Sequence, residues 1–138
     1  MRAYISVSYS RRKNIKDVLN VITEVLQDTG IIPFVFIDAY SFSTSEEKQM
    51  MAKAMLNIDS SDLLIAEVSD KAIGIGVEAG YAKAKGKPII YLRHTDAEHS
   101  TTLAGTSDYQ IIYQNVEDLR INLGMMLRQI TGKQKPPL

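Results

Sequence analysis

The segment with the most evident chemistry is residues 74–78 (GIGVE), which follows a nearly continuous apolar run at residues 62–68. Because glycine has no side chain, Gly74 and Gly76 would let a ligand approach the backbone closely. Glu78 is expected in the first turn of a helix, where the helix dipole favours an ionised carboxylate. An ionised carboxylate beside a bound sugar can attack the anomeric carbon as a nucleophile. The residue types fit equally well a surface glutamate that only complements the helix dipole.

Residues 8–12 (SYSRR) form a second polar segment, directly after the first predicted strand. The hydroxyls of Ser8 and Ser10 and the guanidinium groups of Arg11 and Arg12 are donors suited to a phosphate at a helix start. Ser10 is also expected to cap that helix. The alternative is a helix cap followed by solvated arginines, and residue types alone favour this alternative because such caps are common.

Three further acidic residues and both histidines are candidate site residues. Asp38 is expected at the end of the second strand, where its side chain would face the ligand. Glu67 lies among apolar neighbours and is expected to be a paired structural carboxylate rather than a supporting group of the site. Asp62 begins a strand at the end away from the ligand, which favours a turn or cap role. His94 and His99 fall in a polar loop and are expected to be solvated.

Composition excludes several classes of protein. The 138 residues contain no cysteine, so disulfides, thiol nucleophiles and thiolate metal sites are absent. Sixteen Lys and Arg balance sixteen Asp and Glu, which argues against binding nucleic acid through a general basic excess. No apolar run approaches the roughly 20 residues that span a bilayer, and the first residues do not resemble a signal peptide. A cytoplasmic protein without metal or cofactor is expected.

Apolar periodicity predicts strands alternating with helices, and therefore a doubly wound parallel sheet with helices on both faces, a Rossmann- or flavodoxin-like α/β fold. In such sheets ligands bind beyond the carboxyl ends of the strands. Residues 1–130 are expected to form one domain and residues 131–138 a frayed tail. The predicted strands are residues 2–8, 31–37, 62–68, 89–92 and 110–113; the predicted helices are 11–28, 44–58, a short one ending at Gly86, and 116–130, with a polar loop at 94–108.

Residues 61–69 (SDLLIAEVS), 74–82 (GIGVEAGYA) and 86–90 (GKPII) resemble the nucleoside 2-deoxyribosyltransferase family. They are most similar to its branch of 2'-deoxynucleoside 5'-phosphate N-hydrolases, and the resemblance extends over about residues 3–113. It implies an N-glycosidase that hydrolyses the bond between base and deoxyribose in 2'-deoxynucleoside 5'-monophosphates, through a covalent glycosyl-enzyme.

The same resemblance implies a role for each matching residue. Glu78 would be the nucleophile that attacks C1', and Tyr4 would orient it. The segment 8–12 would contact the 5'-phosphate. Ser100 would reach the phosphate from the neighbouring subunit, in a homodimer that shares its active sites. Gly74 and Gly76 would line the substrate site.

Two positions depart from the family pattern. The family usually has an aspartate, which contacts the sugar and assists protonation of the leaving base, where this chain has Ala54. It also has a serine or aspartate where this chain has Ala72. Asp38 is expected to replace the missing acid, because it is placed at the ligand end of a strand.

Three other functions stay open at this stage. Transfer of deoxyribose to a second base uses the same glycosyl-enzyme. Residues 4–10 (YISVSYS) are similar to the first strand of TIR-like domains, which favours an NAD glycohydrolase as one alternative. The absence of an acid at Ala54 favours, as the other alternative, a nucleotide-binding module without catalysis.

Overall fold

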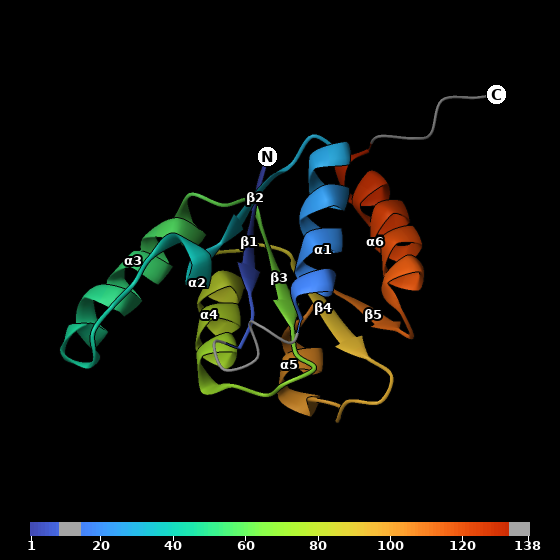
Figure 1. Cartoon of the computed structure of the whole chain (residues 1–138). Coiled ribbons are helices and arrows are strands. Elements are labelled where there is room, and N and C mark those ends of the chain that lie inside the picture. Colours follow the sequence, from blue (N-terminus) through green and yellow to red (C-terminus); the bar gives the residue numbers. More distant parts are fainter. Residues whose placement is uncertain (9–14, 133–138) are drawn as a thin grey trace.

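In the computed structural model, which describes residues 1–8 and 15–132, the described residues form a five-stranded parallel sheet in the order β2-β1-β3-β4-β5. This α/β architecture is the one that the alternating pattern predicts (Figure 1). The elements are β1 (Arg2–Ser6), α1 (Lys16–Asp28), β2 (Ile32–Val35), α2 (Phe36–Ala39), the 3₁₀ turn η2 (Thr44–Glu46), α3 (Glu47–Asp59), β3 (Leu63–Glu67), α4 (Ile73–Ala84), β4 (Ile89–His94), α5 (Thr101–Thr106), β5 (Tyr109–Tyr113) and α6 (Val116–Thr131).

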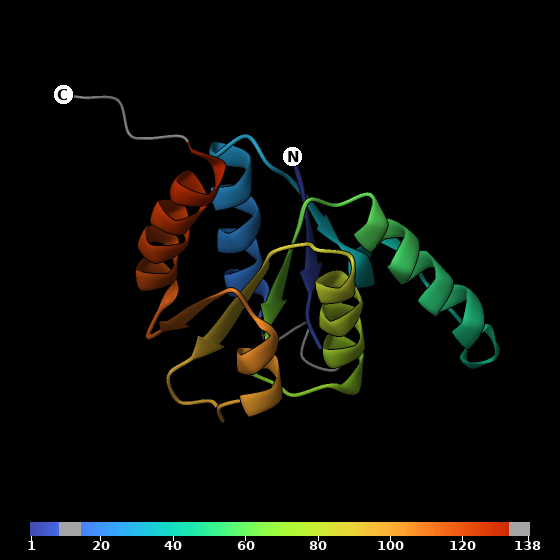
Figure 2. The same cartoon turned by 180° about the vertical axis from the view of Figure 1, so that it is seen from behind.

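Helices cover both faces of the sheet, so its central strands are buried on each side. α1 and α6 pack on the face turned to the viewer in Figure 1, and α4 and α5 lie on the opposite face, seen from the front in Figure 2. Every residue of β3 is buried. Side chains of β1 alternate between the faces: Ile5 joins the core under α1 and α6, whereas Tyr4 joins the core under α3 and α4.

The second strand is shorter than predicted. β2 ends at Val35, and the chain turns at once into α2, so Asp38 is an exposed residue of a one-turn helix rather than the last residue of a strand. The turn brings Phe36 onto Tyr40, four residues on, with ring centroids 5.3 Å apart. Aromatic packing therefore overrides the strand propensity of this segment. β2 is an edge strand and contains Pro33.

Three helix predictions also need correction. α1 begins at Lys16 instead of residue 11, and Ile15 occupies its N-cap position with a non-helical backbone; Ser10, the expected cap, lies outside the described residues. α4 already begins at Ile73, because Ala72 holds the extended backbone of an N-cap. Glu78 therefore lies in the second turn of α4 and not in the first.

The polar loop predicted at 94–108 contains one helix, α5. This short helix packs against α4 and β4 through the buried Leu103, and that contact is invisible to a local pattern. A capping box precedes α3, where the backbone N–H of Ser43 donates to Glu46 Oε1 at 2.9 Å. The predicted turn or cap role of Asp62 is confirmed, since the backbone N–H of Arg2 donates to its carboxylate at 2.8 Å. None of the described helices is long and apolar enough to cross a bilayer.

Glu67, at the end of β3, is the paired structural carboxylate that its surroundings predict. It is 2% exposed and accepts hydrogen bonds from the hydroxyl of Tyr113 at 2.5 Å and from the N–H and hydroxyl of Ser69 at 2.6 and 3.0 Å. Burial raises the pKa of Glu67 above its usual value, and these hydrogen bonds oppose the rise. The carboxylate thus ties the ends of β3 and β5 together across β4.

Tyr113→Phe should lower the free energy of unfolding by about 1–3 kcal/mol at neutral pH, because it leaves the buried Oε2 of Glu67 with the Ser69 hydroxyl at 3.0 Å as its remaining donor. The folded-state pKa of Glu67 would rise further, and a raised carboxyl pKa costs stability only where the group is ionised. The loss should therefore shrink at acidic pH. Urea unfolding at two pH values measures it, with Tyr109→Phe, on the exposed end of the same strand, as control; equal losses from both variants at neutral pH would contradict the pairing.

Candidate active site

Glu78 projects from α4 to the first strand, where two hydroxyls meet its two oxygens. The phenol of Tyr4 donates to Oε2, and the hydroxyl of Ser6 donates to Oε1 at 3.3 Å. Tyr4 and Ser6 are two residues apart on β1, so their side chains share the face that α4 covers. The structure thereby brings together Tyr4 and Glu78, two residues singled out in the sequence, and adds Ser6, which sequence analysis did not select.

Burial dominates the electrostatics of this pair. It raises the pKa of Glu78 above the usual glutamate value, and the hydrogen bonds from Tyr4 and Ser6 oppose the rise. Burial, followed by the negative charge of Glu78, raises the pKa of Tyr4 far above the usual tyrosine value. Tyr4 therefore keeps its proton and remains a hydrogen-bond donor at any physiological pH. A carboxylate held in this way can attack an electrophilic carbon.

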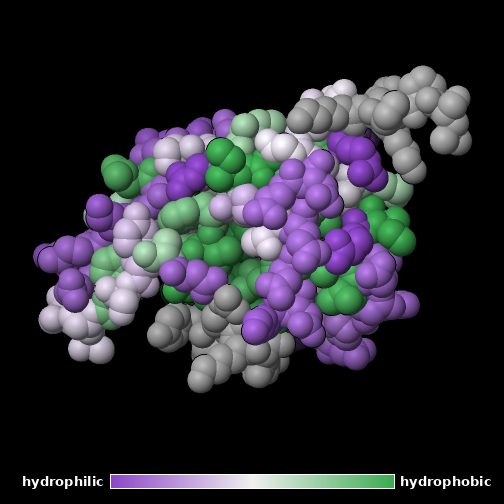
Figure 3. All heavy atoms as spheres, turned by 45° about the horizontal axis from the view of Figure 1, so that its top comes forward, coloured by the Kyte–Doolittle hydropathy of each residue, from purple (hydrophilic) through white to green (hydrophobic). Residues whose placement is uncertain are grey.

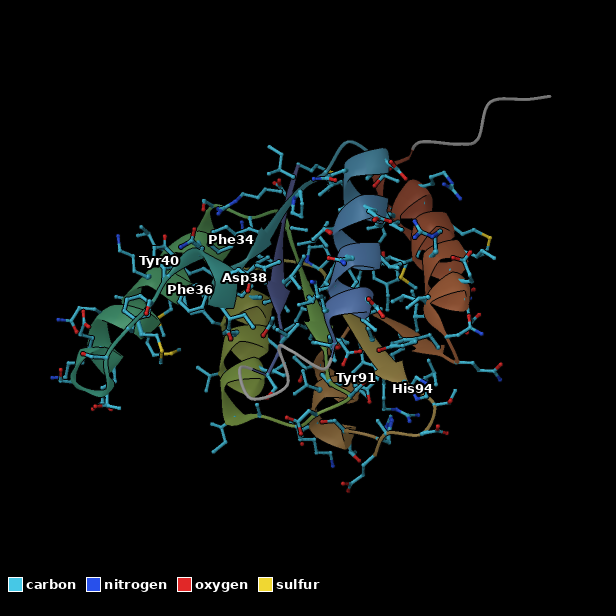
Figure 4. The ribbon with its side chains drawn as sticks, in the orientation of Figure 1. Phe34, Phe36, Asp38, Tyr40, Tyr91 and His94 are labelled. Atoms are coloured by element: carbon cyan, nitrogen blue, oxygen red, sulfur yellow. The ribbon has the colours of Figure 1, made fainter. Side chains whose placement is uncertain are left out.

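Tyr4 also belongs to an aromatic cluster, which consists of Tyr4, Phe34, Phe36, Tyr40 and Phe42. Each ring packs against at least two others of the cluster, and the centroids of the contacting rings are between 5.3 and 6.5 Å apart. Figure 4 shows Phe34, Phe36 and Tyr40 together beside α2, with Asp38 next to them. Figure 3 shows hydrophobic residues at the surface on this side of the molecule. In the segment that carries the cluster, Ile32 is 63% and Tyr40 36% exposed. Flat apolar rings next to a reactive carboxylate offer stacking surfaces for a planar ligand.

The position that lacks the family's acid and the residue predicted to replace that acid lie in different surroundings. Ala54 is 1% exposed and lies in the same buried core as Tyr4, so α3 presents a methyl group there. Asp38 is exposed on α2, beside the aromatic cluster. The prediction that position 54 faces inward is confirmed.

The predicted phosphate segment is described only in part. Ser8 is buried, and its hydroxyl donates to Asp70 Oδ2 at 2.8 Å, which links the end of the first strand to the loop before α4. Ser10, Arg11 and Arg12 lie outside the described residues.

The two glycines are helical residues of α4 and not part of a turn, because neither has a positive φ. A Cβ at Gly74 would lie 3.9 Å from Glu78 Oε1, an ordinary contact distance. A Cβ at Gly76 would lie 3.8 Å from Leu103. The missing Cβ atoms therefore leave room for a methyl-sized group beside Glu78 Oε1 and beside Leu103.

Ser100 lies apart from the Glu78 pair, at the N-cap position of α5. Its N–H donates to the hydroxyl of Tyr91 at 3.1 Å. It lines a cavity of about 270 Å³ between α4 and α5, together with Val68, Lys71, Ala72, Ile73, Ile75 and Leu103. Glu78 does not line this cavity.

Sequence analysis missed Ser6, although the strand period carried the signal: a serine two residues after Tyr4 must lie on the same face. His94 was expected to be solvated, but it packs at the end of the sheet. Its ring lies edge-on against Tyr113, and its backbone N–H donates to Ser69 Oγ at 2.9 Å. In the described part of the chain, no three His, Asp or Glu side chains gather as they would around a metal ion.

Comparison with known proteins gives the family. The family model described as nucleoside 2-deoxyribosyltransferase matches residues 4–130. A protein of Syntrophotalea carbinolica, assigned as a 2'-deoxynucleoside 5'-phosphate N-hydrolase, is 51% identical over 41 residues, which are 30% of this chain and only 29% of that relative.

Two solved structures share the fold. A Clostridium botulinum CMP N-glycosidase superposes with a TM-score of 0.65 at 21% identity, over 91% of this chain and 99% of the other. A 2-deoxyribosyltransferase from Bacillus psychrosaccharolyticus superposes with a TM-score of 0.68 at 16% identity, over 87% and 90% of the two chains. Since the family model spans all but the first and last few residues, the chain belongs to the nucleoside 2-deoxyribosyltransferase family, a family of enzymes.

Proposed function

We propose that this protein is an N-glycosidase that hydrolyses the bond between base and sugar in 2'-deoxynucleoside 5'-monophosphates. The observation that carries the proposal is the half-buried Glu78 carboxylate, held by Tyr4, with room for a Cβ-sized atom beside Oε1 at Gly74. Family membership supports the reaction class. The partial likeness to a 2'-deoxynucleoside 5'-phosphate N-hydrolase supports the choice of substrate.

The proposed reaction has two displacements at C1'. Glu78 Oε1 donates a lone pair to C1' while the C1'–N bond breaks, and the bonding electrons leave with the base, which takes up a proton. Water then adds to C1', loses a proton, and returns the bonding electrons to the carboxylate. Tyr4 holds Oε2 throughout. The missing 2'-hydroxyl eases both steps, because it would otherwise withdraw electrons from the cation-like transition state.

The proposed substrate site extends beyond Glu78. Gly74 and Gly76 would lie against the sugar, and Ser8, Ser10, Arg11 and Arg12 would bind the 5'-phosphate. Asp38 would protonate the leaving base, in place of the aspartate that the family usually has at the position of Ala54.

We further propose a homodimer in which Ser100 completes the partner's phosphate site. The resemblance to the family supports this arrangement. So does the apolar surface of α4 beside the Ser100 cavity, where Ile73 is 89% and Val77 45% exposed. A cytoplasmic location stays a prediction from the sequence.

Deoxyribosyl transfer is the second candidate function. It shares the first displacement and differs only in the acceptor, which would be a second base in place of water. The family name and the likeness to the Bacillus enzyme favour keeping it. Incubation of a deoxynucleotide with and without a second free base separates the two, because only transfer yields a new nucleoside or nucleotide.

Glu78→Gln should lower base release by at least ~10²-fold, because an amide cannot act as the anionic nucleophile. Chromatography of released base, over a panel of deoxynucleosides, deoxynucleotides, ribonucleotides and NAD, measures the effect. Glu117→Gln, at a side chain that is 72% exposed on α6, is the matched control and should be fully active. Near-normal turnover by folded Glu78→Gln would exclude Glu78 as the nucleophile, whereas nucleotide binding without base release by the unaltered protein would favour a binding module.

Monophosphates should be used more efficiently than the corresponding nucleosides. Each charge-assisted hydrogen bond to the phosphate contributes about 1.5–3 kcal/mol, so even one gives about a tenfold or greater difference in kcat/KM. Arg11→Gln and Arg12→Gln should reduce this preference. Equal kcat/KM for the two substrate types would defeat the phosphate assignment and favour the transferase.

Asp38→Asn should lower kcat by about 10²-fold or more, since general-acid assistance to a leaving group is typically worth ~10²–10⁴-fold. Asp62→Asn is the control, because Asp62 lies at the opposite end of the strands. Ala54→Asp should give no gain, because it would bury a second carboxylate in the core around Tyr4. Full activity of Asp38→Asn would leave protonation of the base to solvent or to another residue.

A further inference from the structure

The two oxygens of Glu78 are held by two different hydroxyls from one strand. Tyr4 occupies Oε2, and Ser6 donates to Oε1 at 3.3 Å. Ser6 is 2% exposed and lies in an otherwise apolar stretch of β1, where a serine needs a partner. Among the described residues, these two hydroxyls are the side chains that hydrogen-bond to Glu78.

One donor alone does not orient a carboxylate. The terminal torsion of a glutamate side chain is broad, so a bond from Tyr4 to Oε2 leaves the carboxylate plane free to turn about it. A second donor, on the other oxygen, fixes that plane. The Ser6 bond is long, which orients Oε1 while leaving its remaining lone pairs available.

Space around the carboxylate distinguishes its two oxygens. A carbon placed as a Cβ on Gly74 would sit 3.9 Å from Oε1, so an atom of that size fits beside this oxygen without a clash. Oε2 is instead covered by the phenol of Tyr4. Oε1 is therefore the oxygen with room for a carbon atom beside it, on the Gly74 side.

We propose that Ser6 is a positioning residue for the reaction: its hydroxyl fixes the plane of the Glu78 carboxylate so that Oε1 points at C1'. The proposal rests on the proposed function, since it names the oxygen that attacks. Ser6 acts through Glu78 and does not touch the reacting carbon.

The Ser6 bond also favours the ionised form of Glu78, because a hydroxyl donates to a carboxylate better than to a carboxylic acid. Its removal should raise the pKa of Glu78, and the acid limb of the activity profile should move to higher pH. Tyr4 is the titratable group that contacts Glu78. The other charged groups at α4 are paired: Lys83 with Asp108 near β5, and Lys85 with Asp59 on α3.

The test compares the unaltered protein, Ser6→Ala and Ser61→Ala. Ser61 is the matched control: it is equally buried at 2%, but its hydroxyl donates to the Asn57 carbonyl at 2.7 Å, at the other end of β3. The first readout needs no substrate and is the ¹³C NMR titration of the Glu78 carboxyl carbon, identified by its absence in Glu78→Gln. The second is the pH dependence of kcat and KM for base release from a deoxynucleoside monophosphate.

Ser6→Ala should move the Glu78 titration to higher pH and lower kcat about three- to tenfold, with little change in KM. Ser61→Ala should change neither. Ser6→Cys, which keeps the size and a weaker donor, should fall between the two and replaces Ser6→Ala if that variant does not fold.

An unchanged Glu78 titration together with a normal kcat in Ser6→Ala would overturn the inference. So would an equal loss of kcat in Ser61→Ala, which would indicate a general effect of a lost buried hydroxyl. If no protein releases base, but Ser6→Ala alone shifts the titration, then the proposed function fails while the control of Glu78 by Ser6 stands.

Discussion

The hydrogen bonds from β1 to Glu78 are what allow a carboxylate to lie inside the apolar half of this fold. An ionised group without donors would not stay charged there, because its desolvation is too costly. β1 can supply both donors because it is an inner strand whose register against β3 places Tyr4 beside Leu64 and Ser6 beside Ala66. The small Ala66 leaves the room that the carboxylate needs on that face. The position of Glu78 therefore depends on both the strand register of the sheet and the packing of α4 against it.

A second buried carboxylate shows what a purely structural solution looks like. Glu67 sits on the opposite face of the sheet with three donors, from Tyr113 and Ser69, which use most of its acceptor sites. Glu78 has two donors, both on the β1 side, and a glycine on the other. Both carboxylates use a strand tyrosine. Glu67 is fully buried and has three donors, whereas Glu78 is half-buried and has two, so Glu78 is the carboxylate with more freedom to react.

Local patterns predicted the parallel α/β sheet, because buried strands carry a strong local signal. The GIGVE segment alone fitted a surface glutamate equally well, and Glu78 was predicted as a site residue only through the resemblance to a known family. Local patterns failed where contacts distant in sequence decide. The stacking of Phe36 with Tyr4 and Phe42 turns the chain away from β2 and relocates Asp38. Ser6 gained its importance only from a partner 72 residues away, which no short motif reports.

Pro33 has a consequence for how copies of this protein can meet. The N–H of Ile32, one residue earlier, points inward to the Met1 carbonyl, so the nitrogen of Pro33 points to the outer edge of β2. Proline has no hydrogen to donate there, and a strand added at this edge would lack a bond at the middle of a four-residue ladder. The sheet is thereby protected against growth and aggregation on this side, next to its most aromatic surface.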